Sequence, residues 1–140
     1  MLRPNTVEFL GDPTTWRDVR VSLDDMHGLW GGRRIMVTGT GEAVIELVQP
    51  IGRRSGRFEV WLNPEDVQQL LTRFIENDFL TLVIPSPEKI IPDSVHTSIT
   101  LTNASGAEHT VGCWSGTESD VRFEKLVQAL LEIEARIQEV

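Results

Sequence analysis

The sequence contains a single cysteine, Cys113, so it cannot form an intrachain disulfide. A chain without disulfides fits a reducing compartment. The first residues lack the apolar run of a secretory signal peptide, and no stretch approaches the roughly 20 apolar residues that cross a bilayer. We therefore expect a cytoplasmic protein that does not bind a membrane.

Basic residues are also scarce. The 140 residues include 13 lysines and arginines and 21 aspartates and glutamates, for a net charge of −8 at pH 7. Nucleic acids and anionic lipids bind positively charged surfaces, so this balance argues against both kinds of partner. A hydrophobic content of 40% and a charged content of 24% are ordinary for one soluble globular domain.

What the sequence does contain is one pattern that occurs twice: two alternating strands around a glycine turn, followed by an amphipathic helix. The pattern covers residues 34–77 and again residues 97–137. Alternation of apolar and polar residues predicts strands over the following ranges: 16–23, 33–38, 42–48, 57–62, 97–102 and 107–114.

Both predicted helices have a recognisable start. Asn63 can cap the first helix, and Pro64 suits its first position, where a missing N–H has no consequence. Asn77 and Asp78 end that helix, and the run from Thr117 resembles a capping box for the second one. Each helix carries an apolar stripe at helical spacing. The stripes consist of Val67, Leu70, Leu71 and Phe74, and of Phe123, Leu126, Val127, Leu130, Ile133 and Ile137.

Two segments have weaker patterns. Residues 1–15 predict a loosely ordered lead-in unless Phe9 and Leu10 pack against the domain. Residues 79–84 suggest a short strand, and the prolines after them predict a long loop. Residues 16–140 therefore predict a single α+β domain, a mostly antiparallel sheet of five or six strands with two helices packed on one face.

Strand alternation assigns each side chain to one face of this sheet. The core face is predicted to hold Ile35, Val37, Ile45, Leu47, Phe58, Val60, Leu62, Ile99, Leu101 and Val111. The opposite face is predicted to hold Arg34, Met36, Val44, Glu46, Val48, Arg57, Glu59, Trp61 and Trp114. That second face is too apolar for an ordinary solvated surface.

Three interpretations of the second face are open. The predicted first strand, the N-terminal segment or the long loop could cover it. It could be a homodimer interface, since interfaces are enriched in Trp, Met and Arg, or it could form a ligand groove. The candidate interface residues are Met36, Val44, Val48, Trp61 and Trp114.

A second candidate site follows the segment HGLWGGRR. Glycine amides beside two guanidinium groups can hold a carboxylate or a phosphate. This pattern suggests a small-anion binding or enzymatic pocket near His27, Trp30, Arg33 and Arg34, under the loop 84–96. The other interpretation is a flexible turn followed by solvated arginines.

The remaining motifs have structural explanations. Gly39 and Gly41 lack the third glycine and the following helix of a dinucleotide-binding turn. His109 and Cys113 are about 13 Å apart on a strand, too far to share one metal ion. The run from Asp93 to His96 has the residue types of a catalytic triad, but triad members normally come from separate elements. We therefore expect no catalytic residues, no metal and no cofactor.

Several short motifs resemble a family of small uncharacterised bacterial proteins over roughly residues 18–137. They are His27-Gly28-Leu29-Trp30-Gly31-Gly32-Arg33, Gly39-Thr40-Gly41, Asp78-Phe79, Pro92-Asp93, the strand SITLTN at 98–103, and Gly106. The resemblance implies a hairpin, strand, helix, hairpin, helix layout in a bacterial cytoplasmic protein, and it implies no functional residues. The sequence as a whole favours a noncatalytic interaction or small regulatory protein that self-associates through the sheet face carrying Trp61 and Trp114.

Overall fold

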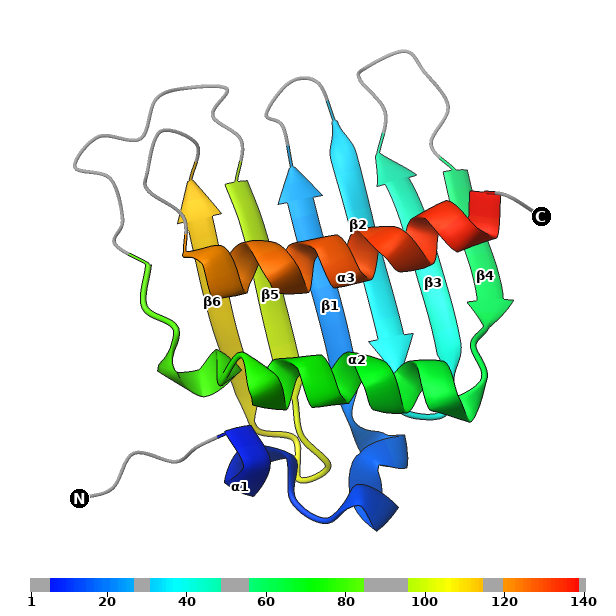
Figure 1. The fold of residues 1–140 in the computed structure, drawn as a ribbon. Coiled ribbons are helices and arrows are strands. Elements are labelled where there is room, and N and C mark those ends of the chain that lie inside the picture. Colours follow the sequence, from blue (N-terminus) through cyan, green and yellow to red (C-terminus); the bar gives the residue numbers. More distant parts are fainter. Residues whose placement is uncertain (1–5, 27–30, 49–55, 85–95, 115–119, 139–140) are drawn as a thin grey trace.

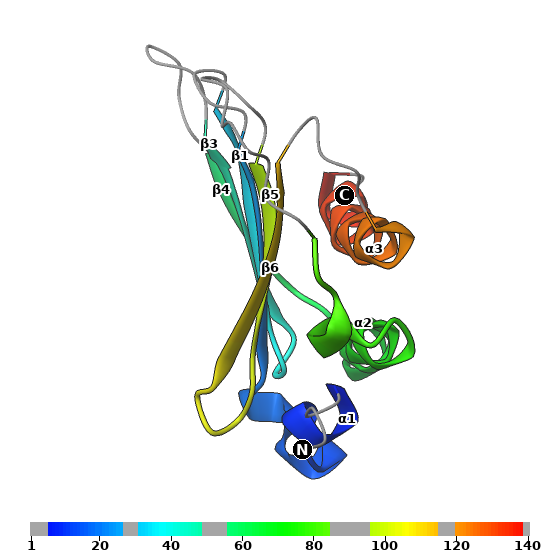
Figure 2. The same cartoon turned by 90° about the vertical axis from the view of Figure 1, so that its left-hand side faces the viewer.

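A computed structural model of the chain describes residues 6–26, 31–48, 56–84, 96–114 and 120–138 (Figure 1). Within these ranges the chain forms an antiparallel sheet of six strands, with the helices packed on one face (Figure 2). The predicted α+β class is confirmed. The elements are α1 (Thr6–Leu10), the 3-10 helix η1 (Pro13–Asp18), β1 (Arg20–Met26), β2 (Gly32–Thr38), β3 (Glu42–Val48), β4 (Gly56–Trp61), α2 (Pro64–Glu76), the 3-10 helix η3 (Phe79–Thr81), β5 (His96–Thr102), β6 (Glu108–Trp114) and α3 (Val121–Gln138).

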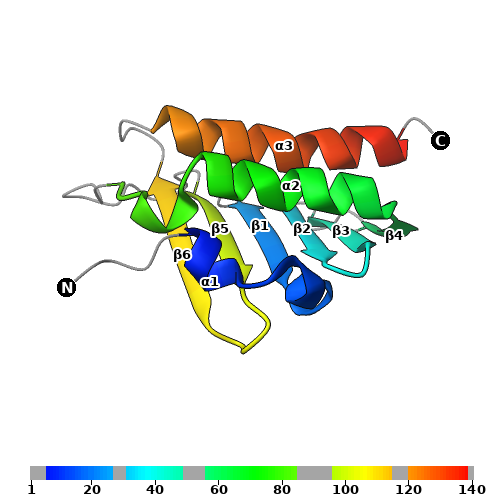
Figure 3. The same cartoon turned by 60° about the horizontal axis from the view of Figure 1, so that its bottom comes forward.

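The strand order β4-β3-β2-β1-β5-β6 places β1 inside the sheet. Strands β1 to β4 follow one another as a meander, after which α2 crosses back over the sheet and β5 pairs with the free side of β1. Helix α3 then crosses in the opposite direction, so that α2 and α3 lie side by side and antiparallel (Figures 1 and 3). The two predicted copies of one unit are therefore unequal, because residues 34–77 hold three strands and residues 97–137 hold two.

Helix α2 begins and ends where the sequence predicts. The side chain of Asn63 accepts a hydrogen bond from the backbone N–H of Asp66 (2.8 Å), and Pro64 is the first helical residue. Glu65 and Asp66 lie in the first turn, where carboxylates favour the positive end of the helix dipole. The predicted apolar stripe of α2 is buried.

Two predicted boundaries are wrong. Trp16 lies in η1 rather than in a strand, because Asp12 caps that turn by accepting from Thr14 N–H (2.9 Å), and β1 begins at Arg20. Residues 79–81 form η3 instead of a short strand, after Asp78 with its left-handed φ of 43°. Helix α3 as described begins at Val121.

The start of α3 has its own capping contact. The carboxylate of Asp120 accepts from Arg122 N–H (2.8 Å), and the Asp120 carbonyl accepts from Glu124 N–H (3.1 Å). Asp120 is therefore the capping residue, rather than the last residue of a capping box. Thr117 lies outside the described residues.

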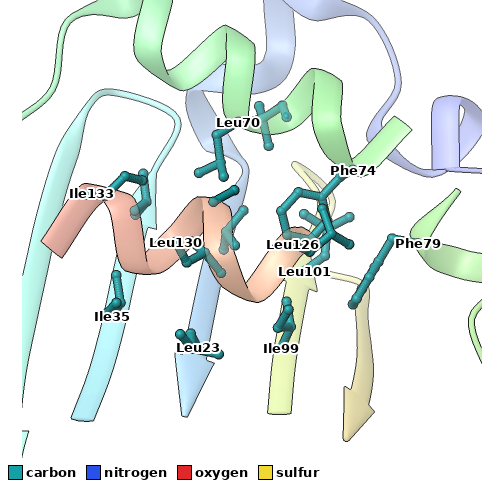
Figure 4. Packing of buried hydrophobic residues seen from close by; sticks show 14 of the residues in the cluster. Leu23, Ile35, Leu70, Phe74, Phe79, Ile99, Leu101, Leu126, Leu130 and Ile133 are labelled. Carbon is teal, nitrogen blue, oxygen red and sulfur yellow. The ribbon is translucent and has the colours of Figure 1, made fainter. Parts of the chain in front are cut away.

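The core fills the space between the sheet and the two long helices (Figure 4). Leu23, Ile35, Ile99 and Leu101 point from the strands toward Leu70 and Phe74 of α2 and toward Leu126 and Leu130 of α3. The predicted core residues Leu47, Val60 and Leu62 are partly buried at its margin.

Phe58 departs from the predicted core. Its register partner Ile45 is 1% exposed, whereas Phe58 itself is 46% exposed. The reason is position in the sheet, since β4 is an edge strand with no further strand beside it in the described part of the chain.

The N-terminal segment packs against the end of the helical layer from Thr6 onward (Figure 3). Leu10 is 1% exposed and Phe9 is partly buried, so these two residues of the predicted lead-in pack against the domain. The buried Thr6 hydroxyl donates to the carboxylate of Asp78 (2.9 Å) and accepts from Leu80 N–H (3.1 Å). These bonds hold α1 against η3.

Candidate functional site

The first candidate surface is the face of the sheet opposite α2 and α3, here called the open face. The register of the strands and the alternation of side chains assign residues to it. They are Arg20, Ser22, Asp24, Met26, Gly32, Arg34, Met36, Thr38, Glu42, Val44, Glu46, Arg57, Glu59, Trp61, His96, Ser98, Thr100, Thr102, Glu108, Thr110, Gly112 and Trp114. The side chain of Val48, a predicted interface residue, lies outside the described residues.

None of the described helices covers the open face (Figure 2). The predicted first strand became β1 inside the sheet, and α1 and η1 lie at one end of the sheet (Figures 1 and 2). The expectation that either segment covers this face is therefore wrong. The middle of the long loop, residues 85–95, lies outside the described residues.

Charges of alternating sign run across the open face on four adjacent strands. Asp24, Arg34, Glu46 and Arg57 are successive register neighbours on β1, β2, β3 and β4. Arg34 Nε lies 2.9 Å from Asp24 Oδ1, and Arg57 Nη2 lies 3.1 Å from Glu59 Oε1. Such exposed pairs stabilise a fold by about 1 kcal/mol at most. The row therefore gives the face both signs of charge rather than a strong field.

Apolar side chains on the open face fall into two separate places. Trp61, at the end of β4, is 73% exposed, and Met36 on β2 is 40% exposed with Val44 beside it on β3. Trp114 is half-buried at the far edge, where its ring lies 4.2 Å from that of His96. The two tryptophans are on opposite edge strands, separated by about 24 Å across five strand spacings. They are also offset along the strands, because the register places Trp61 level with Glu108, six residues before Trp114. The predicted single patch that contains both of them does not form.

The predicted anion pocket does not assemble from its arginines. Neighbouring residues of β2 point to opposite faces, so Arg34 lies on the open face and Arg33 lies on the helix side. Each arginine has its own carboxylate, Asp24 for Arg34 and Glu134 for Arg33. Two arginines whose side chains lie on opposite faces of the sheet cannot bind the same anion, so this part of the prediction is wrong. His27 and Trp30 lie outside the described residues.

A polar network that sequence reasoning missed surrounds Arg33. Arg33 Nη1 donates to Glu134 Oε2 of α3 at 2.5 Å, and Arg33 Nε lies 4.0 Å from Asp25 Oδ2 of β1. Thr97 of β5 donates to Asp25 (3.1 Å), and Glu134 is 5% exposed. The network joins three strands to α3. One residue in the sequence points to this network. Glu134 follows Leu130 by four residues, so this carboxylate lies on the apolar stripe of the second predicted helix.

The glycine pair 39 and 41 serves packing rather than phosphate binding. A Cβ on Gly39 would lie 1.6 Å from the carbonyl oxygen of Trp16, so η1 contacts the hairpin turn directly. Gly41 has a φ of +103°, which a side chain strongly disfavours. Both glycines are therefore explained by the β2–β3 turn.

The main cavities lined by described residues do not bring catalytic groups together. A groove of about 570 Å³ between η1 and α2 is lined by neutral and charged polar side chains together with Pro13 and Trp16. A hollow of about 310 Å³ beside α3 includes Thr97 and Cys113. Across the described ranges, no three His, Cys, Asp or Glu side chains lie close enough together to hold a metal ion. Asp93 and Ser94 lie outside these ranges, and His96 stacks on Trp114.

No protein-family model and no curated protein matches the chain. Among the helices described, none is long and apolar enough to span a bilayer. The features that bear on function are therefore the open face, its charges and the exposed residues of β4.

Proposed function

We propose that this chain is a noncatalytic interaction protein that self-associates through the part of the sheet around β4. The observation that carries the proposal is the exposure of large apolar side chains on both faces of this one edge strand. Trp61 is 73% exposed on the open face, and Phe58 is 46% exposed on the helix face. Val44 lies diagonal to Trp61 across β3 and β4, and its register partner Met36 extends the apolar surface further into the sheet.

The composition of this surface supports a protein partner. Exposed Trp, Phe and Met beside arginine match the residue types that are enriched in interfaces and in their energetic centres. A small-molecule site would instead need a concave, enclosed pocket, and β4 offers an exposed strand edge.

The charges support a second copy of the chain as the partner. Near β4 the open face carries Arg34 and Arg57 among carboxylates, so this region can place opposite charges together when it meets its own copy. A surface of one sign would repel its own copy. An acidic chain of net charge −8 therefore has, near β4, a region where copies can approach.

Light scattering at tens of micromolar tests the proposal. We expect the wild-type chain to have twice the mass of one chain, and Trp61→Ser to shift the population toward the monomer. Val83→Ser is the matched control, because Val83 is 74% exposed and lies outside the strands and helices. A monomeric wild-type protein at these concentrations overturns the proposal.

A further inference from the structure

The backbone of β4 shows which of its groups are free to pair. Leu62 N–H donates to the carbonyl of Gly41 (2.7 Å), next to the register pair Glu42 and Trp61. Backbone groups alternate in direction along an antiparallel strand, so the even-numbered residues of β4 direct their N–H and C=O groups toward β3. Arg57, Glu59 and Trp61 direct theirs outward. In the described part of the chain no strand accepts or donates at this edge.

Edge strands of soluble proteins are commonly protected by charges, prolines or bulges. Strand β4 has no proline, and its two charges, on Arg57 and Glu59, have opposite signs. When two copies of β4 pair in antiparallel orientation, the arginine of each copy can stand opposite the glutamate of the other, so the charges do not repel the second strand. The edge is therefore open to a partner with the same sequence in antiparallel orientation.

The register of such a pair is limited by charge. When the two-fold axis passes through Arg57 or through Glu59, like charges stand directly opposite each other. When it passes through Val60, Glu59 meets Trp61 of the second copy and has no charge partner. When it passes through Phe58, Arg57 of each copy stands opposite Glu59 of the other, and unlike pairs directly opposite are favourable.

We infer that two copies join edge to edge through antiparallel pairing of β4, with the two-fold axis at Phe58. This inference rests on the proposed self-association and names its geometry. Arg57 of one copy and Glu59 of the second copy exchange backbone hydrogen bonds, because both direct their groups outward. Phe58 then forms the closely spaced, non-hydrogen-bonded pair with Phe58 of the second copy, and aromatic pairs at such positions stabilise a sheet.

The arrangement explains the exposure on both faces. The axis is perpendicular to the sheet, so the helices of both copies stay on the same side of one continuous sheet. Phe58 becomes covered on the helix face. On the open face, Trp61 lies diagonal to Arg57 of the second copy, within reach of an arginine side chain.

The other edge of the sheet is less suited to pairing. Val111 of β6 is 5% exposed, and Trp114 is half-buried against His96. Phe79 packs its ring against His109, with centroids 5.4 Å apart. Among the described residues of β6, the large apolar side chains are thus already engaged within one copy.

A charge-exchange experiment tests the inference. Arg57→Glu leaves two carboxylates on β4 and Glu59→Arg leaves two arginines, so in either homodimer like charges stand opposite. We expect each variant alone to raise the dimer dissociation constant at least about tenfold, measured by sedimentation velocity. An equimolar mixture places the two carboxylates of the first variant opposite the two arginines of the second, and we expect it to recover the dimer. Both wild-type side chains are about 60% exposed, so the fold itself should tolerate the changes.

Each outcome decides one proposal. Recovery of the dimer in the mixture supports edge pairing, because contacts within one chain are unchanged by mixing. If the wild type is a dimer and both single variants remain dimers, edge pairing is overturned while self-association stands. Loss of the dimer with Met36→Lys but not with Arg57→Glu indicates face-to-face packing and also overturns edge pairing. A monomeric wild type overturns the proposed function itself.

Amide hydrogen exchange on the wild-type protein gives a test that needs no variant. Edge pairing predicts that the N–H groups of Arg57 and Glu59 exchange more slowly in concentrated than in dilute solution. The N–H of Glu108, at the start of the opposite edge strand, should not depend on concentration. Equal exchange of Arg57 and Glu59 in dimeric and diluted samples overturns the inference.

Discussion

Arg33 of β2 donates from Nη1 to Oε2 of Glu134, a carboxylate of α3 that is almost completely buried. The neighbouring Arg34 makes a similar pair with Asp24 on the open face, where both side chains are solvated. Two adjacent arginines thus have the same chemistry in different surroundings. The difference gives a matched test of the network.

Arg33→Met should destabilise the protein by about 2 kcal/mol, because it leaves the buried Glu134 carboxylate without its charged donor. Arg34→Met should cost less than about 1 kcal/mol, since its pair is exposed. Urea unfolding of the two variants measures both values. Equal costs would show that burial of Glu134 does not control the energy of the pair.

The double variant Arg33→Met/Glu134→Met should recover most of the stability lost in Arg33→Met. Replacing both members of a buried pair by apolar side chains removes the unpaired charge and keeps the volume. The same urea series measures this recovery. Additive losses from the two changes would contradict the interpretation of the pair as a structural link between β2 and α3.

Much of the fold could be predicted because its signals are local. The Asn63-Pro64 start of α2 and the alternation through β2 and β3 depend on residues within a few positions. The pairing of β5 with β1 depends on a long crossover and has no local signal. Alternation along the strand assigns Phe58 to the core face. Its exposure follows from the strand order, which places β4 at the edge of the sheet.

The candidate site was less predictable because it depends on which elements, distant in the sequence, meet in the fold. Separation of Arg33 from Arg34 follows from strand alternation and could have been deduced, whereas the partner of each arginine depends on which elements meet. Trp61 and Trp114 share a face by alternation. Their placement at opposite edges requires the strand order, which alternation within each strand does not reveal.

His109 predicts a dependence of stability on pH. Burial lowers its pKa below the ordinary 6.5, and its Nε2 has no hydrogen-bond partner among the described residues. Its ring meets that of Phe79 edge to face. The unfolded chain therefore binds a proton at a higher pH than the folded protein does. The contribution of neutral His109 to the free energy of unfolding is therefore fully present above pH 6.5. It is lost as the pH drops from 6.5 toward the lowered pKa.

His109→Leu should flatten this part of the profile, measured as the urea midpoint at a series of pH values below neutrality. The remaining histidines stay in the variant, so the difference between the two profiles isolates position 109. Identical slopes for wild type and variant would show that His109 is protonated equally in both states.

Gly39→Ala should cost about 3 kcal/mol, because the new Cβ would lie 1.6 Å from the Trp16 carbonyl oxygen and η1 must move. Gly106→Ala is the control in the other hairpin. It has a φ of +92° but no atom within 4 Å of the new Cβ, so the backbone strain alone should cost about 1 kcal/mol. Thermal unfolding of both variants gives the comparison. A milder effect at Gly39 than at Gly106 would contradict close packing of η1 on the turn.

Sedimentation of the mixed charge variants tests the central claim most directly. Arg57→Glu alone and Glu59→Arg alone should sediment mainly as monomers at tens of micromolar, and their equimolar mixture should sediment as a dimer. A mixture that stays monomeric while the wild type is dimeric would contradict pairing through β4.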